Sequence, residues 1–206
     1  MVASPRSSWN IGLSAWIIQD GNYPDFTVGQ TAEFAVEYYR PPGTGLVLAE
    51  SAVSAQQVSQ TVYEVVAEKV LETDEVTVLD IGILTYREEA LQFPEVATGN
   101  RFSTQLELEV DPYFYFERIS KNQGIPPLIY SWRIDSILRQ TAPFIDVIPD
   151  SGPWAGQKMM IRDASKLGYE EISKTDAWQD DNGTAEYVLC CDLLPVPAKH
   201  LSATAT

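Results

Sequence analysis

Alternation of apolar and polar residues is the feature that most constrains how this 206-residue chain can fold. In residues 31–38 (TAEFAVEY), apolar side chains alternate with two glutamates. Residues 105–110 (QLELEV) repeat the pattern, with aliphatic side chains opposite Glu107 and Glu109. Successive side chains of a strand point to opposite faces. Both segments are therefore predicted to be half-buried strands with an acidic, solvated face.

Helical periodicity is sparse by comparison. Residues 51–68 place three valines at near-helical spacing, although the segment YEVVA within them also fits a strand. Residues 164–174 are the other candidate helix. Most of the 13 prolines and 12 glycines fall between the alternating runs, a punctuation typical of barrels and sandwiches. The predicted class is mostly β, with few short helices.

An internal repeat indicates how the strands are grouped. Residues 11–16 (IGLSAW) align with residues 81–86 (IGILTY) at an offset of 70, and a proline and a glycine further along also match. A period of this length exceeds the ~20–50 residues of solenoid repeats and suggests duplicated small domains. About five strands per unit fit a Greek-key barrel of the OB type.

The chain is therefore predicted to contain tandem OB-like β-barrels, with one continuous β-sandwich as the alternative architecture. The predicted units are an N-terminal arm, a first barrel, a second barrel, and a C-terminal β extension or partial third unit, which occupy residues 1–10, 11–80, 81–150 and 151–206.

Charge limits the classes of partner. The net charge is −15, and residues 1–117 alone carry −13. Such a field repels nucleic acid and anionic membranes, and it attracts a basic protein. Acidity that serves only solubility is the competing interpretation.

The expected location is the cytoplasm. No apolar run approaches the ~20 residues of a membrane span, and residues 1–18 lack the features of a secretory signal. The two cysteines, Cys190 and Cys191, are adjacent, so in a strand they would point to opposite faces. They are interpreted as small strand residues rather than a redox pair.

Common catalytic templates are missing from the sequence. The single histidine, His200, lies near the C-terminus, where a general base is poorly preorganised. The glycine-rich segment 40–45 (RPPGTG) lacks the lysine of a phosphate-binding loop and is interpreted as a strand connection. Residues 176–183 resemble a calcium loop, but position twelve of an EF-hand would be Leu189. No catalytic, cofactor-binding or metal-ligating residue is predicted, and a non-enzymatic role is favoured.

The aromatic run after the acidic strand supplies a candidate interface. Continued alternation would bury Phe114 and Phe116 and expose the two tyrosines beside the acidic residues, and tyrosine is enriched at protein interfaces. The predicted partner-binding residues are the acids and tyrosines of this outward face: Glu107, Glu109, Asp111, Tyr113 and Tyr115.

The resulting functional hypothesis is an acidic module that binds or neutralises a basic protein, as an immunity protein or a nucleic-acid mimic does. A carboxylate-based enzyme and a small-molecule or oligosaccharide-binding accessory protein are the alternatives. Homo-oligomers could form through uncovered sheet edges.

Overall fold

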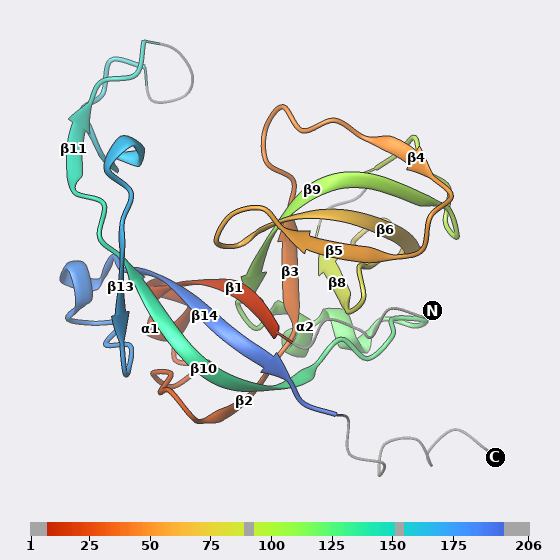
Figure 1. The fold of residues 1–206 in the computed structure, drawn as a ribbon, viewed down its shortest axis with the longest axis horizontal. Helices are drawn as coiled ribbons and strands as arrows, with labels where there is room; N and C mark the ends of the chain where they lie inside the picture. Colours follow the sequence, from red (N-terminus) through yellow and green to blue (C-terminus); the bar gives the residue numbers. More distant parts are fainter. Residues whose placement is uncertain (1–7, 89–92, 151–154, 196–206) are drawn as a thin grey trace.

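The computed structural model describes residues 8–88, 93–150 and 155–195. Strands make up 47% of the structure and helices 10%, so the predicted mostly β class is confirmed. Twelve strands pair into one continuous sheet, and two more form a separate hairpin (Figure 1). Residues 51–68 form no helix; the strands Ser54–Gln57 and Val62–Glu72 lie here instead, so the strand interpretation of YEVVA is confirmed. Residues 164–174 form one 3₁₀ turn and a strand.

Five strands close a barrel. They pair in the order β3–β8–β7–β6–β9, and β9 returns to β3. The β3–β8 pair is parallel and the other pairs are antiparallel. The barrel strands are β3 (Val36–Tyr39), β6 (Val62–Glu72), β7 (Thr77–Asp80), β8 (Leu84–Arg87) and β9 (Arg101–Val110). The short strands β4 (Val47–Ala49) and β5 (Ser54–Gln57) add to β9 and β6 respectively.

A second group of strands leaves the barrel at β9. Strand β1 touches β9 in parallel register at one residue pair, Gly12 and Glu109, and then pairs along its length with β14. Strand β14 continues to β10, which also pairs with β2 and β13. These strands are β1 (Ser8–Ser14), β2 (Thr31–Phe34), β10 (Tyr130–Gln140), β13 (Tyr169–Ile172) and β14 (Glu186–Leu193). The sheet thus forks at β9.

One hydrophobic core joins the barrel to the second strand group. Trp9 and Ile11 of β1 belong to the same buried cluster as the inward residues of β9, and Trp132 of β10 stacks on Phe34 at a centroid distance of 5.5 Å. Full burial of such side chains contributes roughly 1.5–3 kcal/mol each. Period-two alternation supplies this core, because every second residue of β1 and β9 faces inward.

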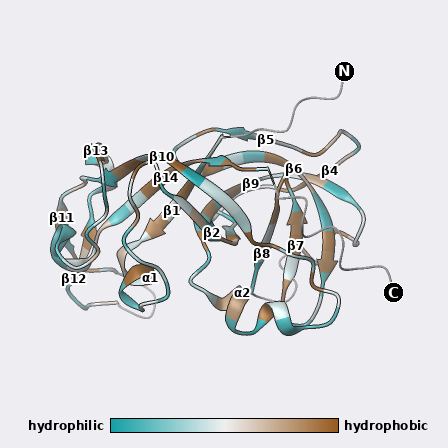
Figure 2. Cartoon of the chain, turned by 90° about the horizontal axis from the view of Figure 1, so that it is seen from below, coloured by the Kyte–Doolittle hydropathy of each residue, from teal (hydrophilic) through white to brown (hydrophobic). Residues whose placement is uncertain are grey.

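Short helical segments cover one side of the sheets. Helices α1 (Ala15–Gln19) and α2 (Phe114–Glu117) lie on the same side (Figure 2). A smaller apolar cluster that includes Tyr86, Tyr115 and Ile119 packs near α2. The 3₁₀ turns are η1 (Ile119–Lys121), η2 (Ala164–Lys166) and η3 (Asp180–Gly183).

A hairpin projects from the body beside the barrel. It consists of β11 (Phe144–Val147) and β12 (Met159–Arg162), which pair only with each other (Figure 1). We call residues 141–168 the arm. Several large apolar side chains on it remain exposed.

The predicted repeat units share the barrel. Segment 11–80 supplies β3, β6 and β7, and segment 81–150 supplies β8 and β9. Residues 8–10 of the predicted N-terminal arm belong to β1, and the rest of that arm lies outside the described residues. Within 151–206, β13 is an edge strand but β14 lies inside the sheet. Duplication of the chain stays a prediction.

A candidate acidic pocket at the sheet fork

The fork in the sheet opens a pocket of about 240 Å³. Beside β9, the Leu108 amide donates to the Thr61 carbonyl at 2.9 Å, and one residue later Gly12 of β1 becomes the neighbour. Because β6 and β1 diverge here, space is left between them. The residues that shape the pocket are Gly12, Thr61, Glu107, Glu109, Gln140, Tyr169 and Glu186, with Leu13, Tyr187 and Val188 completing its lining.

Gly12 is what makes room for the Glu109 side chain. A Cβ on Gly12 would lie 3.2 Å from Glu109 Cγ and 3.3 Å from the Leu108 carbonyl oxygen. Both contacts are tighter than ordinary van der Waals separation. A glycine at this position therefore lets β1 pack closely against β9 without displacing the Glu109 side chain.

Three carboxylates enter the pocket from two strands. Glu107 and Glu109 share a face of β9, and Glu186 comes from the start of β14. The Thr61 hydroxyl donates to Glu107 at 2.9 Å, and the Ser14 hydroxyl donates to Glu186 at 2.6 Å. None of the described residues that line the pocket is a lysine or an arginine.

The pocket is costly for negative charge. Burial, together with the charges of Glu107, Glu186 and Glu37, raises the pKa of Glu109 to about 7, although Arg87 opposes the rise. Burial also raises the pKa of Glu186, although the Ser14 hydroxyl and Arg162 oppose the rise. Glu186 is an exposed residue at the start of β14, and burial is the largest cause of the raised pKa of both acids.

Further buried acids lie next to the pocket. Glu37 pairs with Glu109 across β3 and β9, and its exposed fraction is only 2%. It accepts a hydrogen bond from the Tyr39 hydroxyl at 2.8 Å and lies 3.5 Å from the Arg87 guanidinium. Burial nevertheless raises the pKa of Glu37 to about 7. The pocket therefore belongs to a larger desolvated acidic region.

The structure brings only two of the five predicted partner-binding residues into the pocket, Glu107 and Glu109. Asp111 is fully buried: it accepts a hydrogen bond from the Tyr86 hydroxyl at 2.5 Å and another from the Phe114 amide at 3.0 Å. Burial raises its pKa to about 6. Asp111 thus accepts a hydrogen bond from the first turn of α2 and does not face a partner.

The expected exposure of Tyr115 is wrong. The strand ends at Val110, and α2 starts at Phe114. Tyr115 is buried, and its hydroxyl donates to the Pro126 carbonyl at 3.0 Å. Tyr113 is half-buried with a φ of 79°. The chain reverses here, so alternation no longer predicts which side chains face solvent.

Glu186 is the pocket residue that sequence reasoning missed. The alternating segment 184–189 (TAEYVL) does mark it as an outward residue of a strand. Its closeness to Glu107 and Glu109 depends on the pairing of β14 with β1, which joins opposite ends of the chain. No local pattern reports such a pairing.

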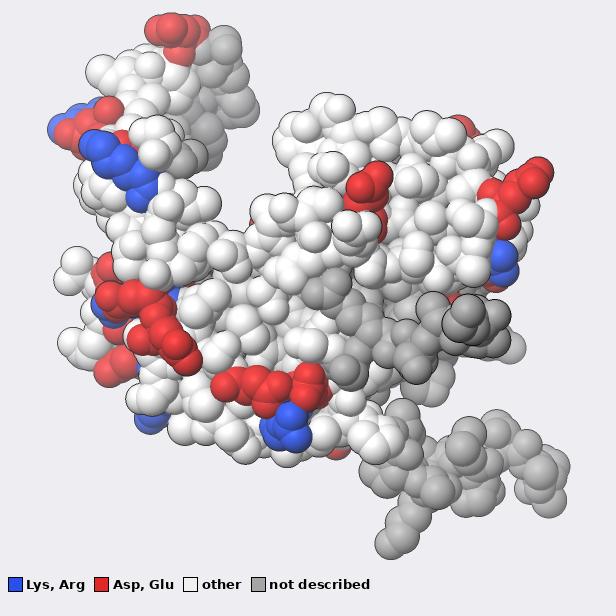
Figure 3. Space-filling view, in the orientation of Figure 1, with Lys and Arg blue, Asp and Glu red and all other residues white. Residues whose placement is uncertain are grey.

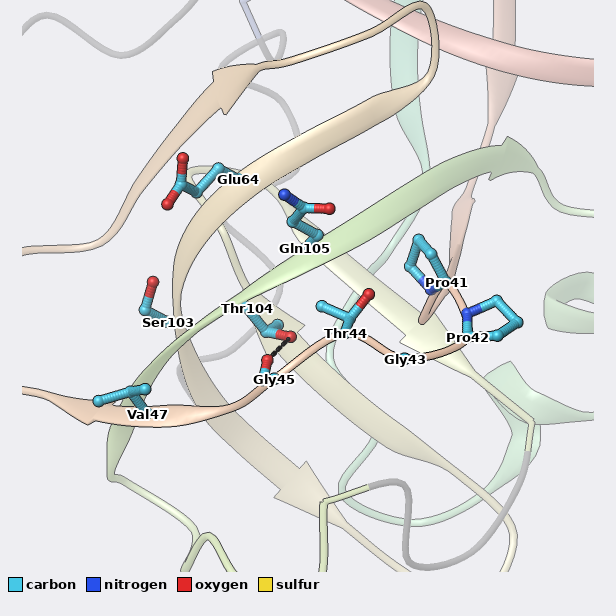
Figure 4. A pocket seen from close by; sticks show the side chains of 10 residues that line it. All are labelled: Pro41, Pro42, Gly43, Thr44, Gly45, Val47, Glu64, Ser103, Thr104 and Gln105. Atoms are coloured by element: carbon cyan, nitrogen blue, oxygen red, sulfur yellow. Dashed lines mark hydrogen bonds between the residues drawn. The ribbon is translucent and has the colours of Figure 1, made fainter.

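A wider groove of about 520 Å³ lies on the barrel, between the loop 40–45 and the outer face of β9 (Figure 4). The loop connects β3 to β4, as predicted, and the Thr104 hydroxyl donates to the Gly45 carbonyl at 2.9 Å. Glu64 is the one charged residue among its described lining, and no aromatic side chain joins it. The groove therefore offers less specific chemistry than the acidic pocket.

The acidic segment 176–183 and the single histidine add no metal or catalytic site among the described residues. Within the described ranges, no group of three or more His, Cys, Asp or Glu side chains could hold a metal ion. Asp180 of the calcium-like segment instead accepts hydrogen bonds from Arg139 at 2.5 Å and from Tyr187 at 2.9 Å. His200 lies outside the described residues. No helix in the part of the chain that the structure covers has the length and apolar character needed to cross a membrane.

Comparison of the chain with protein-family models, curated proteins and solved structures finds no significant match.

Proposed function

We propose that this protein binds a basic protein partner by accepting one lysine or arginine side chain in the acidic pocket. The observation that carries the proposal is the convergence of Glu107, Glu109 and Glu186 in a cavity whose described lining contains no positive charge. The proposal concerns binding and includes no catalytic step.

A cationic side chain would offset both the desolvation of Glu109 and the repulsion among the three carboxylates. Burial disfavours ionised Glu109, and the neighbouring carboxylates add to the cost. An ammonium or guanidinium group would supply opposite charge and several donors at once. Charge-assisted hydrogen bonds of this kind are roughly twice as strong as neutral ones. The bound cation would lower the pKa of Glu109 toward its ordinary value.

The charge on one face of the molecule agrees with a pocket rather than a broad interface. On the face shown in Figure 3, acidic side chains form small, separate groups instead of one continuous patch. A nucleic-acid mimic would need an extended negative surface. The net charge of −15 would still speed encounter with a basic partner, and binding would weaken as salt rises.

The direct test is the binding of a short, labelled peptide with one central arginine, measured by fluorescence anisotropy at low ionic strength. The same peptide with citrulline in place of arginine keeps the shape and removes the charge. We expect the arginine peptide to bind, and the double variant E109Q/E186Q to bind it about tenfold more weakly.

The control is E64Q, which removes one carboxylate, half the number that the double variant removes, from the exposed face of neighbouring β6. It should leave the affinity unchanged. Equal weakening by E64Q would show that only the overall negative field matters, and the pocket proposal would fail. Equal binding of the citrulline peptide would refute it as well.

We also infer that the protein works in a reducing compartment such as the cytoplasm. Cys190 and Cys191 are free thiols on opposite faces of β14, one partly exposed and one buried. Their geometry does not favour a mutual disulfide. Mass spectrometry after thiol alkylation of native-source protein should find both cysteines reduced, and oxidised cysteines would contradict this inference.

A further inference from the structure

The arm exposes apolar surface that its own chain leaves uncovered. Met160 is 66% exposed and Ile148 60% exposed, and Phe144, Ile145 and Ile161 are also exposed. The cross-strand pair of Ile145 and Ile161 marks one face of the hairpin. Phe144 and Met160 lie on the other face, since neighbours in a strand point to opposite sides. Both faces are therefore partly apolar.

A hairpin of this kind is poorly stabilised in water. Isolated two-stranded sheets are marginal, and their unpaired edges are templates for further pairing. Strands β11 and β12 pair only with each other among the described strands. A binding partner would provide the cover that the arm lacks.

The arm is nevertheless held firmly where it leaves the body. Arg162 donates to the Ala142 carbonyl at 2.9 Å and to Asp181 at 2.7 Å, and its guanidinium lies 4.5 Å from the centroid of the Phe144 ring. The Thr141 amide donates to the Gly168 carbonyl at 2.9 Å. These contacts fix the direction in which the arm projects.

The neck of the arm forms part of the pocket wall. Gln140 and Tyr169, which directly precede and follow the arm, pair with each other and line the acidic pocket. The arm on one side and the barrel on the other leave the molecular surface hollowed between them (Figures 1 and 3). A partner that covers the inner face of the arm would thus lie beside the pocket.

We propose that this hollow receives the arm of a second copy of the chain, whose Lys158 enters the acidic pocket. This inference rests on the proposed function and names its basic partner. The arm contains three basic and three acidic residues, so the entire net charge of −15 lies on the remainder of the chain. Two bodies repel each other, whereas the arm, which has no net charge, can approach an acidic body.

Lys158 is the residue best placed to be shared. It is the one basic residue in the segment 144–161, beyond the neck. Its side chain is 66% exposed. It forms an ion pair with Asp146 at 2.8 Å, and the Asp146 side chain is exposed as well. Such surface pairs contribute little, with a median of about 0–1 kcal/mol. Transfer of Lys158 from Asp146 to the three partly desolvated carboxylates in the pocket of the second copy is therefore favourable. The same contact would cover apolar surface on the arm.

The test is sedimentation velocity of the full chain across a concentration series in low salt. We expect concentration-dependent association that salt weakens and that K158E abolishes. The control K121E makes the same charge change at an exposed lysine of η1 and should leave association intact. The pocket variant E109Q/E186Q should also be monomeric. A mixture of K158E with E109Q/E186Q should associate, since one variant keeps the pocket and the other keeps the arm.

A wild-type chain that remains monomeric up to about 0.1 mM would overturn the inference, as this excludes a self-dissociation constant below about 0.1 mM. Equal loss of association in K121E and K158E would overturn it too. If that monomer still binds the arginine peptide, the proposed function stands and only the second copy is excluded as its partner. If it binds no peptide either, both proposals fail.

Discussion

Gly12 and Glu109 face each other in parallel register at the single point where β1 meets the barrel strand β9. The contact joins two parts of the fold, and both residues line the acidic pocket. Stability and site geometry therefore depend on the same pair, and changes at either residue should affect both.

Replacement of Gly12 by alanine should destabilise the protein. The new methyl group would crowd Glu109 Cγ and the Leu108 carbonyl, and overpacking of this kind costs about 1–3 kcal/mol. The free energy of unfolding, measured by urea denaturation, should fall accordingly. Gly45 provides the control, because a Cβ there meets nothing within 4 Å. Equal losses for G12A and G45A would contradict the argument.

The buried acids predict that stability falls as pH rises. Burial raises the pKa of both Glu37 and Glu109 to about 7, above the ordinary value of 4.5. Between these values the folded state holds protons that the unfolded state has released. Each group thus stabilises the fold fully below about pH 4.5, and this contribution is lost as pH rises through about 7.

The measurement is urea denaturation at a series of pH values from 5 to 8. The free energy of unfolding of the variant E109Q should decline less steeply than that of the wild type, because glutamine cannot titrate. Subtraction of the two curves removes the contributions of the other carboxylates to first order. A wild-type curve that runs parallel to the E109Q curve would show that Glu109 titrates normally.

Two buried tyrosines should respond differently to loss of their hydroxyl groups. The Tyr86 hydroxyl donates to buried Asp111, so Y86F should cost about 1.5–3 kcal/mol, the range for hydrogen bonds to charged groups. It should also raise the pKa of Asp111, which that bond lowers. The Tyr23 hydroxyl is buried without a hydrogen-bond partner among the described residues. Y23F should therefore be neutral or stabilising in thermal unfolding, and a loss equal to that of Y86F would refute the distinction.

Local sequence patterns were sufficient for part of this site. Alternation in residues 105–110 correctly placed Glu107 and Glu109 on the strand face opposite the aliphatic residues, because period-two geometry depends only on the strand itself. The expected solvation of that face is wrong at Glu109, which is desolvated in the pocket beside β1. The same rule failed after Val110. Pro112 has no amide to continue the ladder, and Tyr113 adopts a positive φ. Extrapolation from one element into the next therefore misplaced Tyr115.

Long-range pairing accounts for what sequence reasoning could not reach. The valines of residues 51–68 have near-helical spacing, yet the segment forms β5 and the start of β6, because pairing with each other and with β9 outweighs local preference. Glu186 joins the pocket only through the pairing of β14 with β1. The hollow between the arm and the barrel likewise depends on how segments that are distant in the sequence lie relative to one another, which no local pattern reports.

Loss of Arg162 should loosen the arm without unfolding the body. The R162A variant removes the contacts with Asp181 and the Ala142 carbonyl that hold the neck. The hairpin pairs with no strand of the main sheet among the described residues, so global stability should change by less than about 1 kcal/mol while the arm opens locally. Hydrogen exchange should accelerate at the amides of β11 and β12. K166A removes an exposed ion pair with Asp163 and is the control. Unchanged exchange in R162A would mean that pairing within the hairpin, rather than its anchoring, keeps the arm ordered.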